Sequence, residues 1–350
     1  MNPRPTHLAL LLALVHVPAA SAEPPSSLFP TSAERAAVAA AVDRALLFLA
    51  RQQRPDGAFA DGKYHLALTA LATLSFLSAG HPDVDGKYGG VVSRAADLLA
   101  AAVPKDGYVG KVDGSRMYGQ AIITIALAEL IGNTPDEPRR ARLLAALRNT
   151  VPIILAAQNI SKGAEHAGGW RYEPTSTDSD LSLSGWCAQA LRAARGVEID
   201  VPDDALTRAM NYVLTCRTPS GGFAYQAGGN PDTGPTAAGS LTLLLLSPLS
   251  VPALPELAPA LEFLASRPVK FEDRFAYYTV HLALAAAHHA GPAFSPRVTT
   301  WAVPLLLSLQ QPDGGFPQSR SAEEPGRIYA TSLATLALSL PTSPMPSHQR

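Results

Sequence analysis

The sequence predicts an all-α fold, an (α/α)6 toroid in which about six helical hairpins close into a ring. Three observations predict it. Hydrophobic residues make up 47% of the 350 residues, and the helix formers alanine and leucine dominate them. A short glycine-containing turn recurs along the chain. Each turn is followed by a segment that is apolar on nearly every side, and such a helix must be buried on every side.

The recurring turn reads "QQRPDGAF" in the first unit and "QQPDGGFP" in the last. Five copies can be matched through their glycines, which are Gly57, Gly107, Gly169, Gly222 and Gly315. The successive spacings are 50, 62, 53 and 93 residues, so a degenerate copy is expected within the last and longest interval. The segment 266–278 lies there and lacks the glycine. Six repeated units therefore account for the chain.

Each unit places an amphipathic helix before the turn, such as 33–53 or 141–158, and an apolar helix after it. Glycine is expected to end the first helix by adopting the left-handed backbone conformation. The amphipathic helices can then form a solvated outer layer around the apolar ones. An open stack would need polar caps on its end units, yet the last helix, 327–340, is as apolar as the interior ones. The sequence therefore favours a closed ring.

The N-terminus has the pattern of a secretory signal peptide. Arg4 supplies a positive charge, the apolar stretch 8–17 is too short to span a bilayer, and Ala20-Ser21-Ala22 offers a small-x-small cleavage site. An uncleaved apolar anchor is the alternative. We expect an exported protein, periplasmic or secreted, with no transmembrane span in the mature chain. The expected divisions are a signal peptide over 1–22, a linker over 23–32, the toroid domain over 33–340 and a disordered tail over 341–350.

Charge and cysteine content exclude some classes of function. The formal net charge is −1 and no long basic run occurs, which argues against a nucleic-acid partner. Cys187 and Cys216 could pair in an oxidising compartment or remain as two buried thiols, and two cysteines alone make a structural zinc site improbable. His281 and His288 share a helix face, but no carboxylate cluster lies near them in the sequence. We therefore predict no metal and no cofactor.

Several phrases, among them "MYGQAIITIALAELIG" and "GGWRYEPTSTDSDLSLSGWCAQALRAAR", resemble exported bacterial squalene-cyclase-like repeat proteins. These belong to the terpenoid cyclase and protein prenyltransferase superfamily of α/α toroids. The resemblance covers Ala33–Leu340 and implies the ring fold. It implies no single activity, because the same toroid serves cyclases, transferases, lyases and binding modules.

In such a ring, residues at the turns and at the starts of the inner helices gather at one rim. An apolar cavity ringed by aromatic side chains with a few polar groups is typical of a ligand site. The candidate lining residues are Tyr118, Trp170, Tyr172, Trp186, Tyr278, His281, Arg327 and Tyr329, with Tyr225 from the fourth unit. The aromatic residues of the turns, Trp170 among them, are also candidates for packing between neighbouring units.

The phrase "TSTDSDLSLSGW" contains the candidate catalytic residues. Asp178 and Asp180 match the first two acids of the D-x-D-D motif of squalene-hopene-type cyclases, but Leu181 stands where the third acid should be. The resemblance implies a buried carboxylic acid that protonates an alkene, a role that requires a raised pKa. The competing interpretation is that Asp178 or Asp180 caps the helix that starts at Leu181. A prenyltransferase zinc site does not fit, because Asp180 occupies the position of its cysteine.

Two functions remain. The first is a toroid that binds an apolar ligand, or a partner protein, at its centre. The alternative is an isoprenoid cyclase-type enzyme with a modified Asp-x-Asp acid motif. A closed apolar chamber around Asp180 would favour isoprenoid chemistry, and a shallow, charged rim would favour binding alone.

Overall fold

The protein is described from a computed structural model. It covers residues 28–29, 31–60, 62–82, 86–247, 255–320 and 324–345. The expected signal peptide lies outside these residues, as do parts of the expected linker and tail. Within the described residues, no helix is both long enough and apolar enough to cross a membrane.

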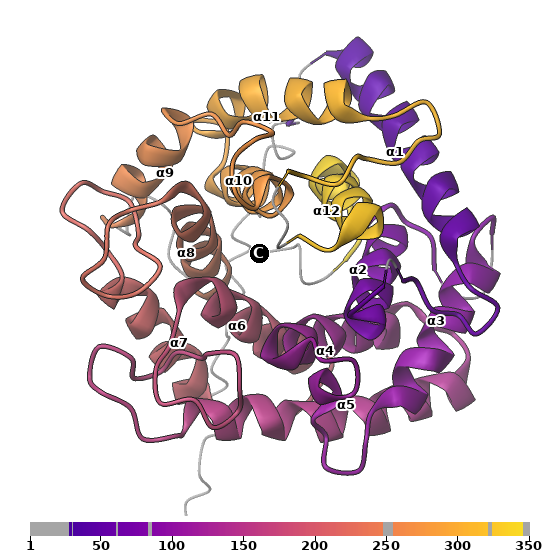
Figure 1. Cartoon of the computed structure of the whole chain (residues 1–350), viewed down its shortest axis with the longest axis horizontal. Coiled ribbons are helices and arrows are strands. Elements are labelled where there is room, and N and C mark those ends of the chain that lie inside the picture. The colour runs from indigo at the N-terminus through magenta and orange to yellow at the C-terminus, as the bar shows by residue number, and fades with distance from the viewer. Residues whose placement is uncertain are drawn as a thin grey trace, which may run out of the picture.

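Two concentric layers of helices make up the structure (Figure 1). The outer helices are α1 (Ser32–Gln52), α3 (Gly89–Ala102), α5 (Glu137–Gln158), α7 (Asp203–Thr215), α9 (Leu257–Ala265) and α11 (Ser295–Leu309). The inner helices are α2 (His65–Ser78), α4 (Arg116–Asn133), α6 (Leu181–Gly196), α8 (Thr233–Leu246), α10 (Ala276–Ala290) and α12 (Gly326–Ser339). Single turns of 3-10 helix are η1 (Val109–Lys111) and η3 (Leu340–Thr342). Outer and inner helices alternate along the chain, as the repeat predicts.

The ring closes between its first and last hairpins. Helix α12 packs against α2, and the hydroxyl of Ser75 donates a 3.1 Å hydrogen bond to the carbonyl of Ser332. In the outer layer, the side-chain amide of Gln310, just after α11, donates to the carbonyl of Ala41 in α1 at 2.8 Å. The predicted (α/α)6 toroid is confirmed. An open stack is excluded, because the two ends of the repeat contact one another.

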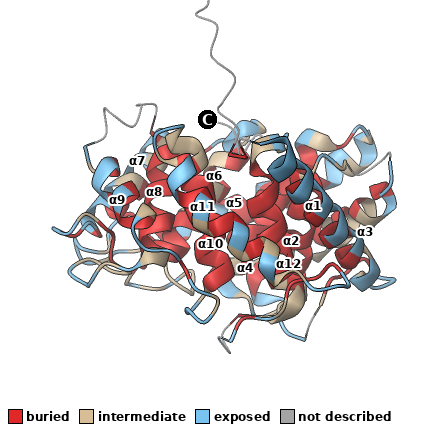
Figure 2. Cartoon of the chain, turned by 90° about the horizontal axis from the view of Figure 1, so that it is seen from above, coloured by how far each residue is buried: buried red, intermediate tan, exposed pale blue. Residues whose placement is uncertain are grey.

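Burial separates the two layers (Figure 2). In α2 every residue from Leu66 to Ser78 is buried, and in α8 every residue from Pro235 to Leu245 is buried. The outer helix α7 buries one face, which includes Ala205, Ala209 and Val213. The polar residues of the inner helices are mostly small. The hydroxyl of Thr73, for example, donates to the carbonyl one turn earlier, so it can be buried without an unpaired group.

The structure corrects the matching of the turn glycines. Within the recurring turns, the glycines with a left-handed backbone are Gly57, Gly107, Gly168, Gly221 and Gly314. In three of these turns the left-handed residue is therefore the glycine before the one matched in the sequence. Each of these turns packs on the next outer helix. At Gly57, an added Cβ would lie 2.5 Å from the carbonyl oxygen of Arg94 in α3. The position therefore requires glycine for its space as well as for its backbone angle.

A glutamine secures most of these turns to the neighbouring unit. Gln158 donates hydrogen bonds of 2.9 Å to the carbonyls of Gly168 and Ala205, and Arg208 of α7 donates back to it. Gln53 and Gln310 make the equivalent contacts in their own units. These residues fasten consecutive hairpins together, which holds the starts of the inner helices in register around the rim.

Candidate functional site

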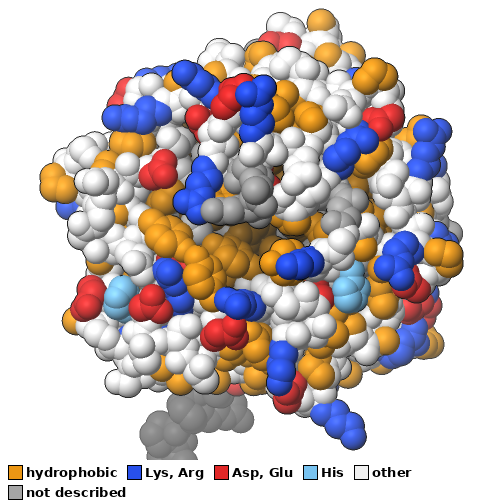
Figure 3. All heavy atoms as spheres, viewed as in Figure 1, with side chains coloured by type: hydrophobic (Ala, Val, Ile, Leu, Met, Phe, Trp, Pro, Cys, Tyr) orange, Lys and Arg blue, Asp and Glu red, His pale blue; other side chains and the backbone are white. Residues whose placement is uncertain are grey.

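The candidate site lies where the inner helices begin. The chain before α6 is fixed there by its backbone, because the N–H of Asp180 donates to the carbonyl of Trp170 and the N–H of Leu181 donates to the carbonyl of Tyr225, both at 2.9 Å. Figure 3 shows a hollow at the centre of the ring with hydrophobic side chains inside it and Lys and Arg side chains around its mouth. Asp180 is thus held at a defined position at the start of α6.

The carboxyl group of Asp180 caps α6. Its Oδ1 accepts a 2.9 Å hydrogen bond from the N–H of Leu183, which confirms the capping interpretation for this residue. The side chain is fully buried, and Oδ2 has no hydrogen-bond partner among the described residues. Burial raises the pKa of Asp180 to about 6, although the Leu183 N–H and the charge of Arg171 oppose that rise. The carboxyl group of Asp180 can therefore gain or lose a proton at a pH only slightly below neutral.

Arg171 faces both aspartates. Its guanidinium lies 3.5 Å from Oδ2 of Asp178 and 3.6 Å from Oδ2 of Asp180. It also lies over the rings of Tyr172 and Tyr225, at 4.5 Å and 5.4 Å from their centroids, which are cation–π distances. Asp178 is half-exposed and does not cap the helix. The two aspartates of the motif therefore have different surroundings.

Four tyrosines and a tryptophan from five segments meet beside Asp180. The ring centroids of Tyr118 and Tyr172 are 6.1 Å apart, and those of Trp186 and Tyr278 are 6.4 Å apart. The hydroxyls of Tyr172 and Tyr225 share a 2.7 Å hydrogen bond. Burial raises the pKa of Tyr118 and of Tyr278, and the charge of Asp180 raises both further. We call Tyr118, Tyr172, Trp186, Tyr225 and Tyr278 the aromatic cluster.

The remaining expected lining residues divide into two groups. His281 lies on α10 close after Tyr278, is 5% exposed, and has its pKa lowered to about 4 by burial, so it is neutral at physiological pH. Tyr329 of α12 is partly buried, and its pKa is raised by burial and by the charges of Glu324 and Tyr278. The influence of Tyr278 associates Tyr329 with the aromatic cluster, and His281 follows Tyr278 by three residues on α10.

Trp170 and Arg327 are placed differently. Trp170 is fully buried, and its indole N–H donates a 2.7 Å hydrogen bond to the carbonyl of Ile154 in α5. Trp170 therefore packs between the outer and inner helices. This is the packing role that the sequence offered as the alternative to lining the cavity. Arg327 pairs with Asp313 at 2.8 Å and lies over the ring of Phe48 in α1, so its contacts fasten the last unit to the first.

The sequence did not identify two residues at this rim. Arg171 is a single arginine in a loop, and only the pairing of Trp170 with Asp180 brings it to the aspartates. Glu324, from the segment before α12, is 2% exposed and lies near the N–H groups of Tyr277 and Tyr278. Burial raises its pKa. No local pattern marks either residue, because their positions depend on contacts between separate units.

Metal-binding groups are absent from the part of the chain that the structure describes, where no three His, Cys, Asp or Glu residues come together. Cys187 and Cys216 are both buried as free thiols, so the disulfide alternative is not formed. Burial raises the pKa of the Cys187 thiol well above its ordinary value, which leaves it protonated and unreactive.

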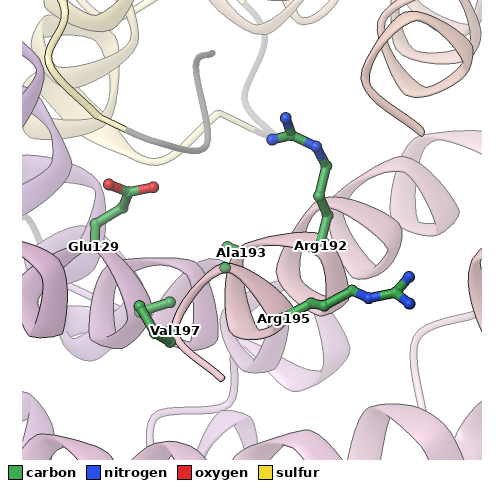
Figure 4. Close-up of a pocket in the computed structure, with 7 residues that line it drawn as sticks. Glu129, Arg192, Ala193, Arg195 and Val197 are labelled. Atoms are coloured by element: carbon green, nitrogen blue, oxygen red, sulfur yellow. The ribbon is translucent and has the colours of Figure 1, made fainter. Parts of the chain in front are cut away.

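Two further hollows are lined by residues outside the aromatic cluster. A cavity of about 270 Å³ lies between the last turns of α4 and α6, where Glu129 and Arg192 project to the same side (Figure 4). Burial lowers the pKa of Arg192, and the charge of Glu129 opposes this. A wider groove of about 580 Å³ lies beside Arg116, which pairs with Glu173 at 3.1 Å. Both are lined by charged groups, unlike the hydrophobic hollow of the ring.

Comparison with known proteins agrees with this architecture. No protein-family model matches the chain. It is 27% identical over 312 residues to drimenyl diphosphate synthase of Streptantibioticus cattleyicolor. That match covers 85% of this chain and 54% of the relative, so the chain spans about half the length of the curated protein it matches.

Solved structures show the same fold at low identity. The type II terpene cyclase MstE from Scytonema is 14% identical, with a TM-score of 0.56 over 88% of this chain and 98% of that one. An α-1,6-mannanase of a Salegentibacter species, solved with α-1,6-mannotriose, is 11% identical, with a TM-score of 0.60 over 87% of this chain and 99% of that one. The protein therefore has a terpenoid cyclase-like α/α toroid. This confirms the resemblance at the level of fold, which cyclases and glycosidases share.

Proposed function

We propose that the ring binds an apolar small molecule at its centre, with the aromatic cluster as the binding surface. The observation that carries the proposal is the gathering of five aromatic side chains, from α4, α6, α10 and two loops, beside Asp180 at the start of α6. The ring also has a hydrophobic hollow at its centre (Figure 3). Aromatic faces offer large apolar area, and their tyrosine hydroxyls can orient a ligand. The substrate-bound MstE structure, which contains geranylgeranyl dihydroxybenzoate, gives one example of an apolar ligand in this fold.

Equilibrium dialysis with farnesol and squalene tests this function. Trp186→Ala removes the largest ring of the aromatic cluster and should weaken farnesol binding about tenfold or more. Trp301 lies on the outer helix α11, so Trp301→Ala is the matched control and should leave binding unchanged. If neither probe binds the wild-type protein, or if both variants bind equally well, the centre of the ring is not the binding surface for such molecules.

A second candidate is a cyclase-type enzyme in which Asp180 donates a proton to an alkene. The specific observation in its favour is a fully buried carboxyl group whose pKa is raised to about 6 and whose Oδ2 accepts no hydrogen bond. Neighbouring aromatic faces could stabilise a carbocation. The charge of Arg171 and the lack of a third acid at Leu181 both favour the ionised carboxylate, which reduces the protonated fraction of Asp180. The similarity to drimenyl diphosphate synthase supports testing it.

Incubation with polyprenyl substrates, followed by gas chromatography and mass spectrometry, distinguishes these candidates. An enzyme would give cyclised products that disappear in Asp180→Asn, which keeps a capping side chain but cannot donate the proton. Binding of farnesol without any cyclised product would favour the binding toroid. Another protein as the partner remains a separate outcome, to be detected as a complex by size-exclusion chromatography of cell extracts.

Export and the domain limits remain proposals as well. The composition of residues 1–22 supports a cleaved signal peptide ahead of a toroid domain over 33–340. N-terminal sequencing of the protein secreted or released from the periplasm should find Glu23 first. A chain that stays in the cytoplasm and still begins at Met1 would contradict export.

A further inference from the structure

The guanidinium of Arg171 makes no hydrogen bond to any described residue, although it carries five N–H donors. Its two nearest acceptors, on Asp178 and Asp180, lie 3.5 and 3.6 Å away, too far or too poorly aligned to bond. The side chain is 20% exposed, and its Nη1 is buried. A buried donor without a partner is rare in folded proteins and indicates a missing acceptor.

The matching acceptor, Oδ2 of Asp180, is also without a hydrogen bond, while Oδ1 of the same carboxyl is occupied by the Leu183 N–H. The hydroxyl of Tyr225 lies near this carboxyl and lowers its pKa, and it also shares a 2.7 Å hydrogen bond with the hydroxyl of Tyr172. An unsatisfied donor and an unsatisfied acceptor therefore face one another at the start of α6, beside the aromatic cluster.

One oxygen atom can bridge the two unpaired atoms from the side. Nη1 and Oδ2 are 3.6 Å apart, so an oxygen beside the pair, rather than between its members, can lie about 2.8 Å from both at once. That oxygen must accept a hydrogen bond from Arg171 and donate one to Asp180. A hydroxyl group can do both, whereas an ether or a carbonyl oxygen can only accept.

The charges favour a neutral group over an anion. Arg171 contributes one positive charge and is opposed by the carboxylates of Asp178 and Asp180. A phosphate or carboxylate placed at this position would be repelled by both aspartates. A hydroxyl group satisfies the two unpaired atoms without adding charge.

We propose that Arg171 and Asp180 together bind the hydroxyl group of an otherwise apolar ligand whose hydrocarbon part lies against the aromatic cluster. The ligand class is therefore an apolar alcohol. This inference rests on the proposed binding function, and it assigns a role to Arg171, a residue outside the family motif.

Three probes that share one hydrocarbon chain test it: farnesol, farnesyl methyl ether and farnesyl phosphate. The ether still accepts from Arg171 but cannot donate to Asp180. We expect the wild-type protein to bind farnesol about tenfold or more tighter than either of the others. Arg171→Met should weaken the binding of farnesol and of the ether alike, because both ligands accept a hydrogen bond from Arg171.

The matched control is Arg116→Met. Arg116 begins α4 at the same end of the ring but pairs with Glu173, away from Asp180. This variant should bind farnesol and the ether as the wild type does, and circular dichroism should show that both variants fold. Equal binding of farnesol and the ether by the wild type would overturn the inference and leave the binding function intact. Tightest binding of the phosphate would assign Arg171 to an anion instead. Failure of all three to bind would remove both proposals.

Discussion

Oδ1 of Asp180 accepts a 2.9 Å hydrogen bond from the backbone N–H of Leu183, three residues further along α6. The second oxygen of the same carboxyl faces Arg171 and has no hydrogen bond among the described residues. Helix capping and ligand chemistry are therefore compatible in one residue, because each uses a different oxygen. The capping interpretation explains the position of Asp180 and does not account for its burial.

The capping role predicts different effects for two substitutions. Asp180→Asn keeps an oxygen that can accept from Leu183, whereas Asp180→Ala removes it. Alanine should lower the free energy of unfolding at pH 7 by about 1–2 kcal/mol more than asparagine does. Urea denaturation of both variants measures the difference. Equal losses would show that the cap contributes little to stability.

Asp180 and His281 should give stability opposite dependences on pH. Burial raises the pKa of Asp180 from 3.8 to about 6, so its contribution is most favourable below pH 3.8 and is lost as pH rises to 6. Burial lowers the pKa of His281 from 6.5 to about 4, so its contribution is most favourable above pH 6.5 and is lost as pH falls to 4. Each is worth roughly 3 kcal/mol over its range, so the two nearly cancel in the wild type between pH 4 and 6.

Single substitutions should separate these two effects. Relative to the wild type, Asp180→Asn should gain stability as pH rises from 4 to 6, because the titration of His281 is then unopposed. His281→Gln should lose stability over the same interval, because the titration of Asp180 is unopposed. Urea denaturation at half-unit pH steps measures both slopes. Parallel curves for the two variants would contradict the assigned pKa directions.

The sequence predicts the ring better than the site. The burial of the inner helices follows directly from their composition, and α8 shows this most clearly, since it contains no charged residue. In the turns, a Gly-Gly pair offers two candidates for the left-handed position, and Gly168 rather than Gly169 adopts it. An added Cβ at Gly168 would lie 2.4 Å from the carbonyl oxygen of Arg208 in the next outer helix. That contact joins separate units, so local pattern cannot reveal it. The same is true of Arg171, whose neighbour Asp180 is set by backbone pairing across a loop.

Gln120 replaces a missing glutamine in the second unit. Val103 stands four residues before Gly107, where Gln53 stands before Gly57. The structure instead shows Gln120, on the inner helix α4, donating to the carbonyls of Gly107 at 2.9 Å and Thr150 at 3.0 Å. An amide from a different helix therefore makes the bonds that the turn requires.

Removal of the Gln120 amide should destabilise the protein, and a glutamine at position 103 should restore part of the lost stability. Gln120→Ala removes the two hydrogen bonds to these carbonyls and a third from the N–H of Gly110, and it should lower the free energy of unfolding by about 2–4 kcal/mol. Adding Val103→Gln should recover part of that loss by restoring the pattern of the other units. Gln189→Ala is the control, because Gln189 bonds only within its own helix, and it should change stability by less than about 0.5 kcal/mol. A second substitution that gives no recovery would show that the two glutamine positions are not equivalent.

The turn glycines should separate backbone strain from close packing. Gly168 and Gly228 both have a left-handed backbone, with φ of +87° and +77°. A Cβ at Gly168 would collide with the carbonyl of Arg208, whereas a Cβ at Gly228 would meet nothing within 4 Å. Gly228→Ala should therefore lower the free energy of unfolding by about 1 kcal/mol, because only the backbone conformation becomes unfavourable. Gly168→Ala should cost at least about 3 kcal/mol, because α7 must also move away from the turn. Thermal denaturation of the two variants checks this, and similar melting temperatures would mean that the turn does not hold the neighbouring outer helix in place.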